Sequence, residues 1–391
     1  MRGKAAIVGV SDAVSPTGEL EGSTRALETK VIKEALDDAG LSIGDVDGIF
    51  SASGAGWAHS LELAEYLGIT APRWTDSTQA GGASYEVHVE HAAAAIALGL
   101  CDVAVSVYAA TPRGSRKKGG GGFRSRQTMG GATPMAEWEM PYGLRMPLGA
   151  YALAASRHMA DYGTTSEQLA QIAVSTRQWA AKNDRAFSQT PMTVDDVLAS
   201  PLEASPLHRL DCCLVTDGAG AVVLTSAERA KDLRTKPAYV LGAGTSHTHS
   251  IISQMPDLTR TAAAVSGPRA FSMAGVTPND IDIAMLYDSF TITVLLALED
   301  LGFCAKGEGG AFVEDGKLGP GGSRPTNTNG GGLSYTHPGA YGMFLLVEAV
   351  RQLRGECGDR QVDGAELALA HGCGGVLSAT STVVLGTEAT L

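Results

Sequence analysis

The side chains best suited to acid–base chemistry lie in one short segment near the C-terminal end. His337-Pro-Gly-Ala-Tyr341 places an imidazole and a phenol four residues apart, and the apolar pattern from Met343 to Leu353 predicts a following helix. One helical turn would bring two such side chains together. A phenol with its ordinary pKa of about 10 becomes a base only if that pKa falls, and a neighbouring histidinium would lower it. We therefore expect Tyr341 and His337 to act as a pair.

A second chemical feature is the glycine-rich turn Ser77–Tyr85, which precedes the apolar run Val87–Gly99. Backbone N–H groups at the start of a helix can bind a negative charge. We expect Gly82 and Ala83 to supply such donors, and Gly374, in a second glycine-rich stretch, to complete an oxyanion hole. The turn offers no cysteine or serine at Gly82 that could attack a substrate.

Composition excludes several classes of protein. With 391 residues, of which 44% are hydrophobic and 18% charged, the chain exceeds one typical domain and can bury a large core. Its net charge of −12 argues against nucleic acid as a partner. Since no apolar run reaches about 18 residues and the strand-like Ala5–Val10 begins at once, we expect neither a membrane helix nor a signal peptide. Six cysteines without metal-ligand spacing predict reduced thiols in the cytoplasm and no metal site.

The chain repeats one structural plan. Ala35–Phe50 and Ala270–Met285 each have the pattern of a helix end, a glycine, a short capped turn and a strand. Gly40 and Gly275 stand where a helix C-terminus favours a left-handed residue. Each unit follows a glycine-containing strand and precedes an apolar helix and another buried strand. These later strands are predicted at Cys101–Val107 and Ala365–His371. Such alternation predicts two doubly wound α/β halves with mixed sheets.

We predict an N-terminal half of residues 1–235 and a C-terminal half of residues 236–391. The repeat is interrupted between about 110 and 215, where the basic, glycine-rich run Pro112–Arg126 precedes an amphipathic helix with a capping box. We interpret this region as an insertion that caps the site of the first half.

Four stretches resemble the thiolase superfamily, and within it the sterol-carrier-protein or lipid-transfer-type branch. They are Tyr162–Ala170, Asp217–Ala221, Gly302–Gly309 and Asn327–Pro338. They follow the family's order over nearly the whole chain. The resemblance implies a duplicated five-layer αβαβα fold, a homodimer and acyl-coenzyme A substrates. Coenzyme A is then part of the substrate, and no separate cofactor is expected.

The departures from that family bear on the reaction. Where the family has its nucleophilic cysteine this chain has Gly82, although His337 resembles the histidine that would activate it. Tyr287-Asp-Ser-Phe290 replaces the Asn-Glu-Ala-Phe turn of thiolases, and His371 maps to their acid–base cysteine. Tyr341 stands where a small hydroxylated residue is usual.

A lost cysteine with tyrosines near the histidine resembles the lipid-transfer-type aldolases of steroid side-chain degradation. Those enzymes split a β-hydroxyacyl-CoA into a ketone and a shortened acyl-CoA such as propionyl-CoA. The resemblance also implies a partner subunit with an OB-fold and a zinc ribbon, and hence a heterotetramer. In this reaction Tyr341 would be the base and His337 an oxyanion donor. Tyr287 would be a second acid–base group, and His371 is a further catalytic candidate.

Two other functions remain open: an acyltransferase that uses Cys373, and a non-catalytic acyl-CoA-binding subunit for an active partner. Arg113, Arg116 and Lys117 could bind the phosphates of coenzyme A, although such a run is more often a solvated loop. Asp288 could either brace its loop or contact substrate.

Overall fold

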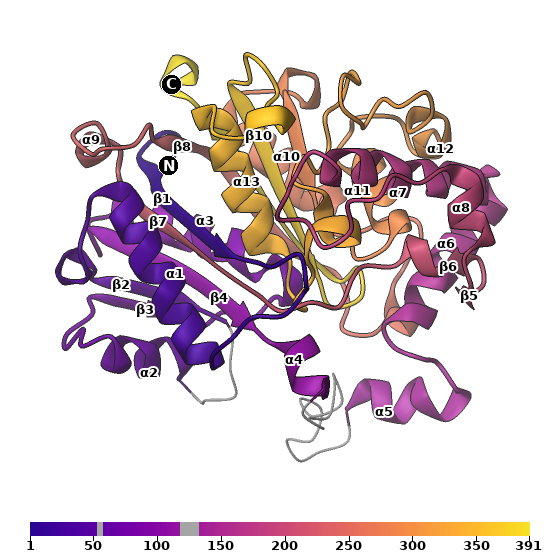
Figure 1. The fold of residues 1–391 in the computed structure, drawn as a ribbon, viewed down its shortest axis with the longest axis horizontal. Helices are drawn as coiled ribbons and strands as arrows, with labels where there is room; N and C mark the ends of the chain where they lie inside the picture. Colours follow the sequence, from indigo (N-terminus) through magenta and orange to yellow (C-terminus); the bar gives the residue numbers. More distant parts are fainter. Residues whose placement is uncertain (53–57, 118–132) are drawn as a thin grey trace.

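The computed structural model describes residues 1–52, 58–117 and 133–391 (Figure 1). Most of the basic run, from residue 118 to 126, therefore lies outside the described residues. Nine strands form one mixed sheet in the order β3-β2-β4-β7-β1-β8-β11-β10-β9. Their bounds are β1 Ala5–Ala13, β2 Gly48–Ser51, β3 Trp74–Asp76, β4 Val103–Ala110, β7 Gly218–Ser226, β8 Ala238–His247, β9 Ile283–Leu286, β10 Leu367–Gly374 and β11 Ala379–Gly386.

The two halves of this sheet repeat the same pairing. In the first half β1 is antiparallel to β7, β7 is antiparallel to β4, and β4 is parallel to β2. In the second half β8, β11, β10 and β9 follow the same pattern. The halves join where β1 pairs antiparallel with β8, at Ala6–Tyr239 and Ile7–Ala238. The duplication predicted from the sequence is thus visible in the topology, and the predicted boundary at 235/236 falls just before β8.

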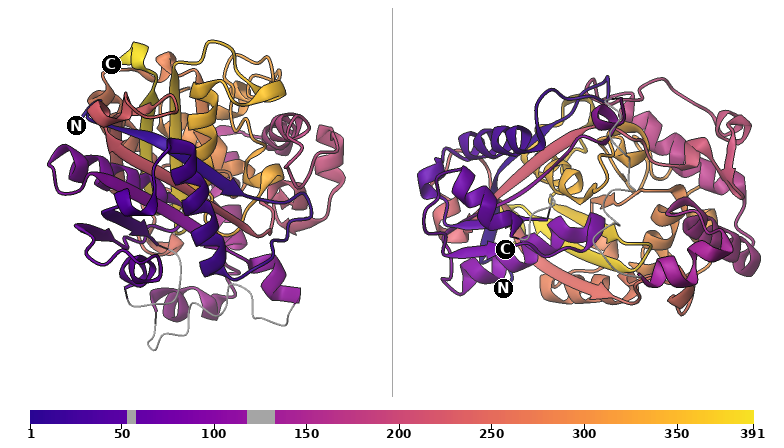
Figure 2. Two further views of the ribbon diagram at one scale, coloured as in Figure 1. Left: turned by 60° about the vertical axis from the view of Figure 1, so that its left-hand side comes forward. Right: turned by 90° about the horizontal axis from the view of Figure 1, so that it is seen from below.

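Helices complete five layers (Figures 1 and 2). The outer helix α1 (Thr24–Ala39) packs on β1, β4 and β7, and its counterpart α10 (Ala263–Ala274) packs on β8 and β11. Between the halves lie α3 (Ser84–Ala97) and α13 (Gly342–Arg354), which contact each other and strands of both halves. The order is therefore α, β, α, β, α, as the resemblance predicted.

Matching caps end the two outer helices. Gly40 ends α1 with φ of 74°, and Gly275 ends α10 with φ of 70°, both left-handed conformations that glycine adopts without strain. Each is followed by a single 3-10 turn closed by a capping box, at Ile43–Asp45 and Pro278–Asp280. These local signals were readable from the sequence and are confirmed.

The inserted region is mostly helical. It comprises α4 (Pro112–Lys117), α5 (Pro134–Trp138), α6 (Leu148–Tyr162), α7 (Ser166–Ala180), α8 (Val194–Ala199) and a hairpin of β5 (Leu202–Ala204) with β6 (Leu207–His208). Helices α6 and α7 pack on α11 (Thr291–Asp300), which belongs to the C-terminal half, and α7 also packs on α12 (Gly309–Phe312). The inserted region therefore packs on the C-terminal half, whereas we expected it to cap the site of the N-terminal half. The remaining helices are α2 (His59–Tyr66) and α9 (Ala227–Ala230).

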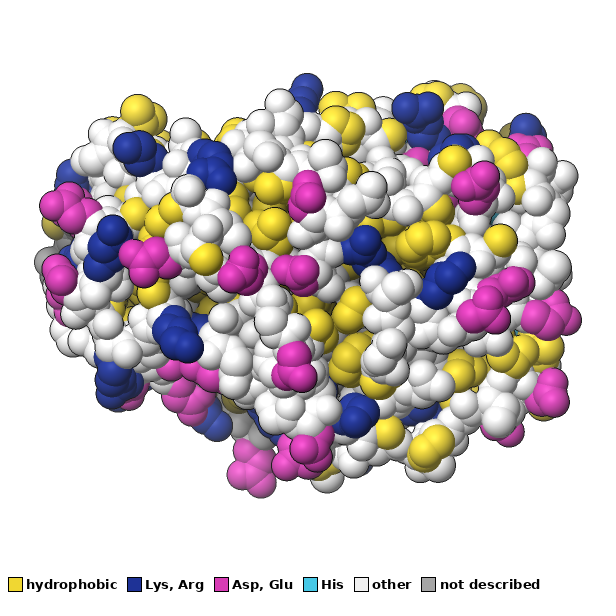
Figure 3. All heavy atoms as spheres, turned by 90° about the horizontal axis from the view of Figure 1, so that it is seen from above, with side chains coloured by type: hydrophobic (Ala, Val, Ile, Leu, Met, Phe, Trp, Pro, Cys, Tyr) yellow, Lys and Arg dark blue, Asp and Glu magenta, His cyan; other side chains and the backbone are white. Residues whose placement is uncertain are grey.

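The surface in Figure 3 carries acidic and basic side chains interspersed among apolar ones. Within the described ranges, no helix has the length and apolar character needed to cross a bilayer.

Two glycines let the outer helices approach the sheet closely. A Cβ on Gly9 of β1 would lie less than 3.0 Å from the carbonyl oxygen of Ala35, and one on Gly242 of β8 would lie as close to that of Ala270. Real Cβ atoms essentially never come so near to backbone, so each half needs a glycine where its outer helix crosses the sheet.

We expect Gly242→Ala to lower the free energy of unfolding by about 1–3 kcal/mol, because the new methyl group must push α10 off β8. Denaturant unfolding measures this change. Gly44→Ala is the matched control, since a Cβ there would meet only Ser42 Oγ, at 3.7 Å. Equal stabilities of the two variants would contradict the close approach.

Candidate active site

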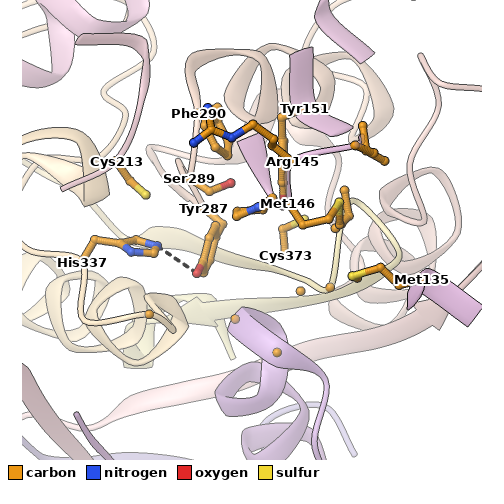
Figure 4. Close-up of a pocket in the computed structure, with 18 of the residues that line it drawn as sticks. Met135, Arg145, Met146, Tyr151, Cys213, Tyr287, Ser289, Phe290, His337 and Cys373 are labelled. Carbon is orange, nitrogen blue, oxygen red and sulfur yellow. Dashed lines mark hydrogen bonds between the residues drawn. The ribbon is translucent and has the colours of Figure 1, made fainter. Parts of the chain in front are cut away.

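A cavity of about 720 Å³ lies where the two halves meet the inserted region (Figure 4). Its glycine floor is formed by Gly81 and Gly82 before α3 and by Gly374 and Gly375 at the end of β10. Its wall from residues 135–151 is mostly apolar. Three methionines contribute to this wall: Met135, Met140 and Met146. Unbranched thioether side chains adapt to the shape of a bulky apolar ligand.

A phenol and an imidazole meet inside the cavity. Tyr287, which follows β9, and His337, in the loop before α13, both line it, and Tyr287 Oη lies 3.1 Å from His337 Nε2 (Figure 4). The backbone N–H of Tyr341 donates a hydrogen bond of 3.2 Å to the same phenolic oxygen. The oxygen of Tyr287 is therefore held by two polar groups at the cavity surface.

Tyr341 itself lies differently from the sequence expectation. Its side chain is fully buried, its hydroxyl donates to Asn329 Oδ1 at 2.9 Å, and it is not among the described residues that line the cavity. Its ring only stacks on that of His337, with centroids 6.2 Å apart. Because α13 begins at Gly342, His337 lies outside the helix and the one-turn spacing does not apply. The hydrogen-bonded partner of His337 is Tyr287 instead.

The ring of Tyr287 occupies the space that a side chain at position 82 would need. A Cβ on Gly82 would lie less than 3.0 Å from both Cε2 and Cζ of Tyr287, and also from the carbonyl oxygen of Cys373. No cysteine can therefore replace Gly82 unless Tyr287 moves. The phenol stands where a nucleophilic side chain would otherwise project.

Burial keeps this pair neutral. Removal from water lowers the pKa of His337 to about 4 and raises the pKa of Tyr287 well above its usual range. The expected histidinium beside a phenolate is therefore wrong: at neutral pH a protonated phenol faces an uncharged imidazole. Such an imidazole can accept the phenolic proton at Nε2.

The two glycine stretches that were expected to form an oxyanion hole do come together. A Cβ on Gly81 would lie less than 3.0 Å from the backbone nitrogen of Gly375, so these segments touch. Gly82 and Gly374 line the cavity. Ala83 does not line it, and its N–H already donates to Ala80 O at 3.2 Å. Its predicted place in the hole is therefore not supported by the geometry.

His371 lies on β10 and is not among the described residues that line the cavity. It is paired with Thr382 of β11, where its Nδ1 lies 2.8 Å from Oγ1, and burial lowers its pKa to about 3. Cys373, nearer the end of the strand, does line the cavity, but burial raises the pKa of its thiol to about 12. Burial also raises the pKa of Cys213, the other lining thiol. Protonated thiols are poor nucleophiles.

Asp288 braces the loop that carries His337. Its carboxylate accepts the N–H of Gly332 at 2.6 Å and that of Leu333 at 3.1 Å, and its side chain is fully buried. The sequence left open whether this residue braces the loop or contacts substrate, and the geometry favours bracing. Across the described ranges, no group of three or more His, Cys, Asp or Glu side chains is arranged to hold a metal ion.

The predicted phosphate-binding residues lie elsewhere. Arg113 and Lys117 contact Glu19, at 3.5 and 2.5 Å, and neither they nor Arg116 line the cavity among the residues that the structure describes. The cation that does line it is Arg145, which sequence reasoning missed (Figure 4). The one feature of the sequence that could have pointed to Arg145 is its place in a methionine- and proline-rich segment.

We expect Gly82→Cys to lower the free energy of unfolding by about 1–3 kcal/mol through overpacking against Tyr287. Adding Tyr287→Ala should cost less than the sum of the two single changes, because the ring is then gone. Denaturant unfolding of the four chains in this cycle measures the coupling. Tyr239→Ala, a buried tyrosine on β8, should combine additively with Gly82→Cys, and equal coupling in both cycles would refute the contact.

Comparison with known proteins agrees with the fold and the site. A model described as "Thiolase C-terminal domain-like" matches residues 244–387. An acetyl-CoA acetyltransferase of Methanothermobacter thermautotrophicus is 36% identical over 95% of this chain and 96% of its own. A steroid side-chain-cleaving aldolase of Thermomonospora curvata is 35% identical over 99% of this chain and 98% of its own. The solved structure of an Ltp2-ChsH2(DUF35) aldolase covers 100% of this chain and 99% of its own, with a TM-score of 0.87 and 33% identity. The chain belongs to the thiolase superfamily, in the lipid-transfer-type branch that includes steroid side-chain-cleaving aldolases.

Proposed function

We propose that the protein is an acyl-CoA retro-aldolase, a lyase that cleaves a bulky steroid β-hydroxyacyl-CoA into a ketone and a shortened acyl-CoA such as propionyl-CoA. The observation that carries this proposal is the contact between Gly82 and Tyr287. An acyl-enzyme needs a nucleophilic side chain at that place, whereas retro-aldol cleavage needs only a proton acceptor and a site for the enolate. The aldolases among the relatives support the same choice.

The neutral pair can move the one proton that the reaction requires. As the substrate's β-hydroxyl passes its proton to Tyr287 Oη, Tyr287 passes its own to His337 Nε2, 3.1 Å away. The carbon–carbon bond then breaks, the alcohol carbon becomes the ketone, and the bonding electrons move into the thioester as an enolate. The same proton returns through Tyr287 to the enolate carbon. The hydroxyl proton thus ends on the acyl-CoA, and no external acid or base is consumed.

The negative charge of the enolate develops on the thioester oxygen. We place this oxygen at the glycine floor, where the N–H groups of Gly82 and Gly374 are the donors that support the proposal. Donors fixed in a water-poor cavity stabilise such a charge strongly. Tyr341 contributes through its backbone N–H, which holds the oxygen of Tyr287, rather than as the base.

The cavity also supports a bulky apolar acyl group. Its volume of about 720 Å³ is in the range of sites for ligands of drug size, and its methionine wall is apolar. Arg145 lies on this wall, exposed to solvent, with no ion pair to any described residue. We propose that Arg145 binds the phosphates of the coenzyme A part, in place of Arg113, Arg116 and Lys117.

We further propose that the protein works as a homodimer bound to a partner subunit with an OB-fold and a zinc ribbon, giving a heterotetramer. The solved relative whose name pairs Ltp2 with ChsH2(DUF35) supports a second polypeptide. The open edge at β3 and the exposed Trp138 and Tyr142, which are 64% and 85% exposed, offer surface for such contacts.

The test of the reaction is to supply a β-hydroxyacyl-CoA with a ring system on the alcohol carbon and to measure the ketone and the shortened acyl-CoA. We expect Tyr287→Phe to lower kcat by about 10²–10³, because the proton path is lost. Tyr341→Phe removes only the bond to Asn329 and should lower kcat less than about tenfold. Cys373→Ala should leave the rate unchanged. Full activity of Tyr287→Phe, or an acyl adduct on Cys373, would refute the mechanism and favour an acyltransferase.

Arg145→Ala should raise KM for the CoA thioester by about tenfold with little change in kcat, because a charge-assisted contact is lost equally from ground and transition states. A pantetheine thioester of the same acyl group lacks the nucleotide phosphates, so its KM should be the same for both chains. Arg116→Ala is the matched control and should change neither value. An unchanged KM in Arg145→Ala would assign the phosphates elsewhere.

A further inference from the structure

One buried acid near the cavity has no role in the mechanism above. Glu86 lies on α3, one turn after Gly82, and its side chain is fully buried. Its carboxyl group fits between two backbones: a Cβ on Gly342 or on Gly372 would lie less than 3.0 Å from Glu86 Oε2. Both neighbours must therefore lack a side chain for this acid to fit. Glu86 is not among the described residues that line the cavity.

Apart from the backbone N–H of Glu86 itself, no group within the described part of the chain donates a hydrogen bond to either of its carboxyl oxygens. The same Cβ position on Gly342 would also lie less than 3.0 Å from the carbonyl oxygen of Gly82. Two oxygens that both accept hydrogen bonds thus share one crevice. The carbonyl oxygen of Gly82 would repel an ionised carboxylate there. The buried charge would also be destabilised by the loss of water, because no positive group in the described ranges compensates it. A proton on Glu86 removes this repulsion and gives the carboxyl group a donor.

Among the residues that the structure describes, the groups around Glu86 provide no compensating positive charge. From β10, Cys373 is the titratable side chain that senses Glu86, and a charged Glu86 would raise the pKa of that thiol. His371 on β10 and Tyr341 at the start of α13 are bonded to Thr382 and Asn329 instead. Burial raises the pKa of Glu86 to about 8, opposed only by its own backbone N–H.

We propose that Glu86 is a positioning residue that is held as the neutral acid and donates its proton to the carbonyl oxygen of Gly82. This bond fixes Gly82, whose other side touches the ring of Tyr287. The same carboxyl group packs on Gly342, the residue after the N–H that holds the oxygen of Tyr287. Glu86 thereby ties together the backbones that orient the proton path. Its effect on kcat rests on the proposed function, whereas its protonation state does not.

The sign of the pH effect follows from the raised pKa. Between the ordinary value of 4.5 and about 8, the folded protein keeps a proton that the unfolded chain releases. Glu86 therefore lowers the unfolding free energy as pH rises through this window, and the effect is complete above pH of about 8. Above that pH the ionised acid also loses its bond to Gly82. Glu86→Gln cannot ionise and still offers an N–H donor, so it should remove both effects.

The experiment compares the full-length wild type with Glu86→Gln and Glu86→Leu. We expect Glu86→Gln to have the higher midpoint of thermal unfolding at pH 8, and a smaller advantage at pH 5. Its kcat should stay within about twofold of wild type at pH 7 and exceed wild type by about tenfold at pH 9.5. Glu86→Leu fills the space without a donor, so kcat should fall about tenfold at pH 7 while KM is unchanged.

Three results would overturn the proposal. These are a lower unfolding midpoint for Glu86→Gln than for wild type at pH 8, identical pH profiles of the two chains, or full kcat in Glu86→Leu. If Glu86→Leu does not fold, the comparison with Glu86→Gln still decides. If the wild type cleaves no β-hydroxyacyl-CoA, the proposed function fails, but the unfolding midpoints still report whether Glu86 is neutral.

Discussion

No side chain fits at position 82, because the ring of Tyr287 lies where its Cβ would be. Because of this steric constraint, position 82 cannot carry a nucleophilic side chain. The phenol of Tyr287 occupies that space instead. The ring keeps that position because its oxygen is bonded to His337 and to the N–H of Tyr341. On the same floor, the backbone of Gly81 packs closely against those of Gly374 and Gly375. The chemistry of the cavity follows from this packing.

Burial also shifts the pKa values of four groups around the floor toward their neutral forms. The same loss of water lowers the pKa of His337 and raises those of Tyr287, Cys373 and Glu86. All four shifts favour the uncharged form of the group at neutral pH. A site of this kind is poorly suited to a thiolate mechanism, but it can pass a proton between neutral partners.

Overall similarity does not separate the two reactions found among the relatives. An acetyltransferase and a steroid aldolase are almost equally similar to this chain, at 36% and 35% identity. In this chain, the contact between Gly82 and the ring of Tyr287 leaves no room for a nucleophilic side chain at position 82. A fold can thus carry different reactions on nearly unchanged backbones.

The sequence by itself determined what depends on neighbours along the chain. It predicted the repeat, the caps at Gly40 and Gly275 and the absence of a nucleophile at Gly82, because such features are set within a few residues. Only the tertiary structure decided which tyrosine meets His337. The partner is Tyr287, 50 positions away, whereas the hydroxyl of Tyr341 donates its hydrogen bond to Asn329. Contacts between distant segments depend on how layers pack, and local spacing carries no information about that.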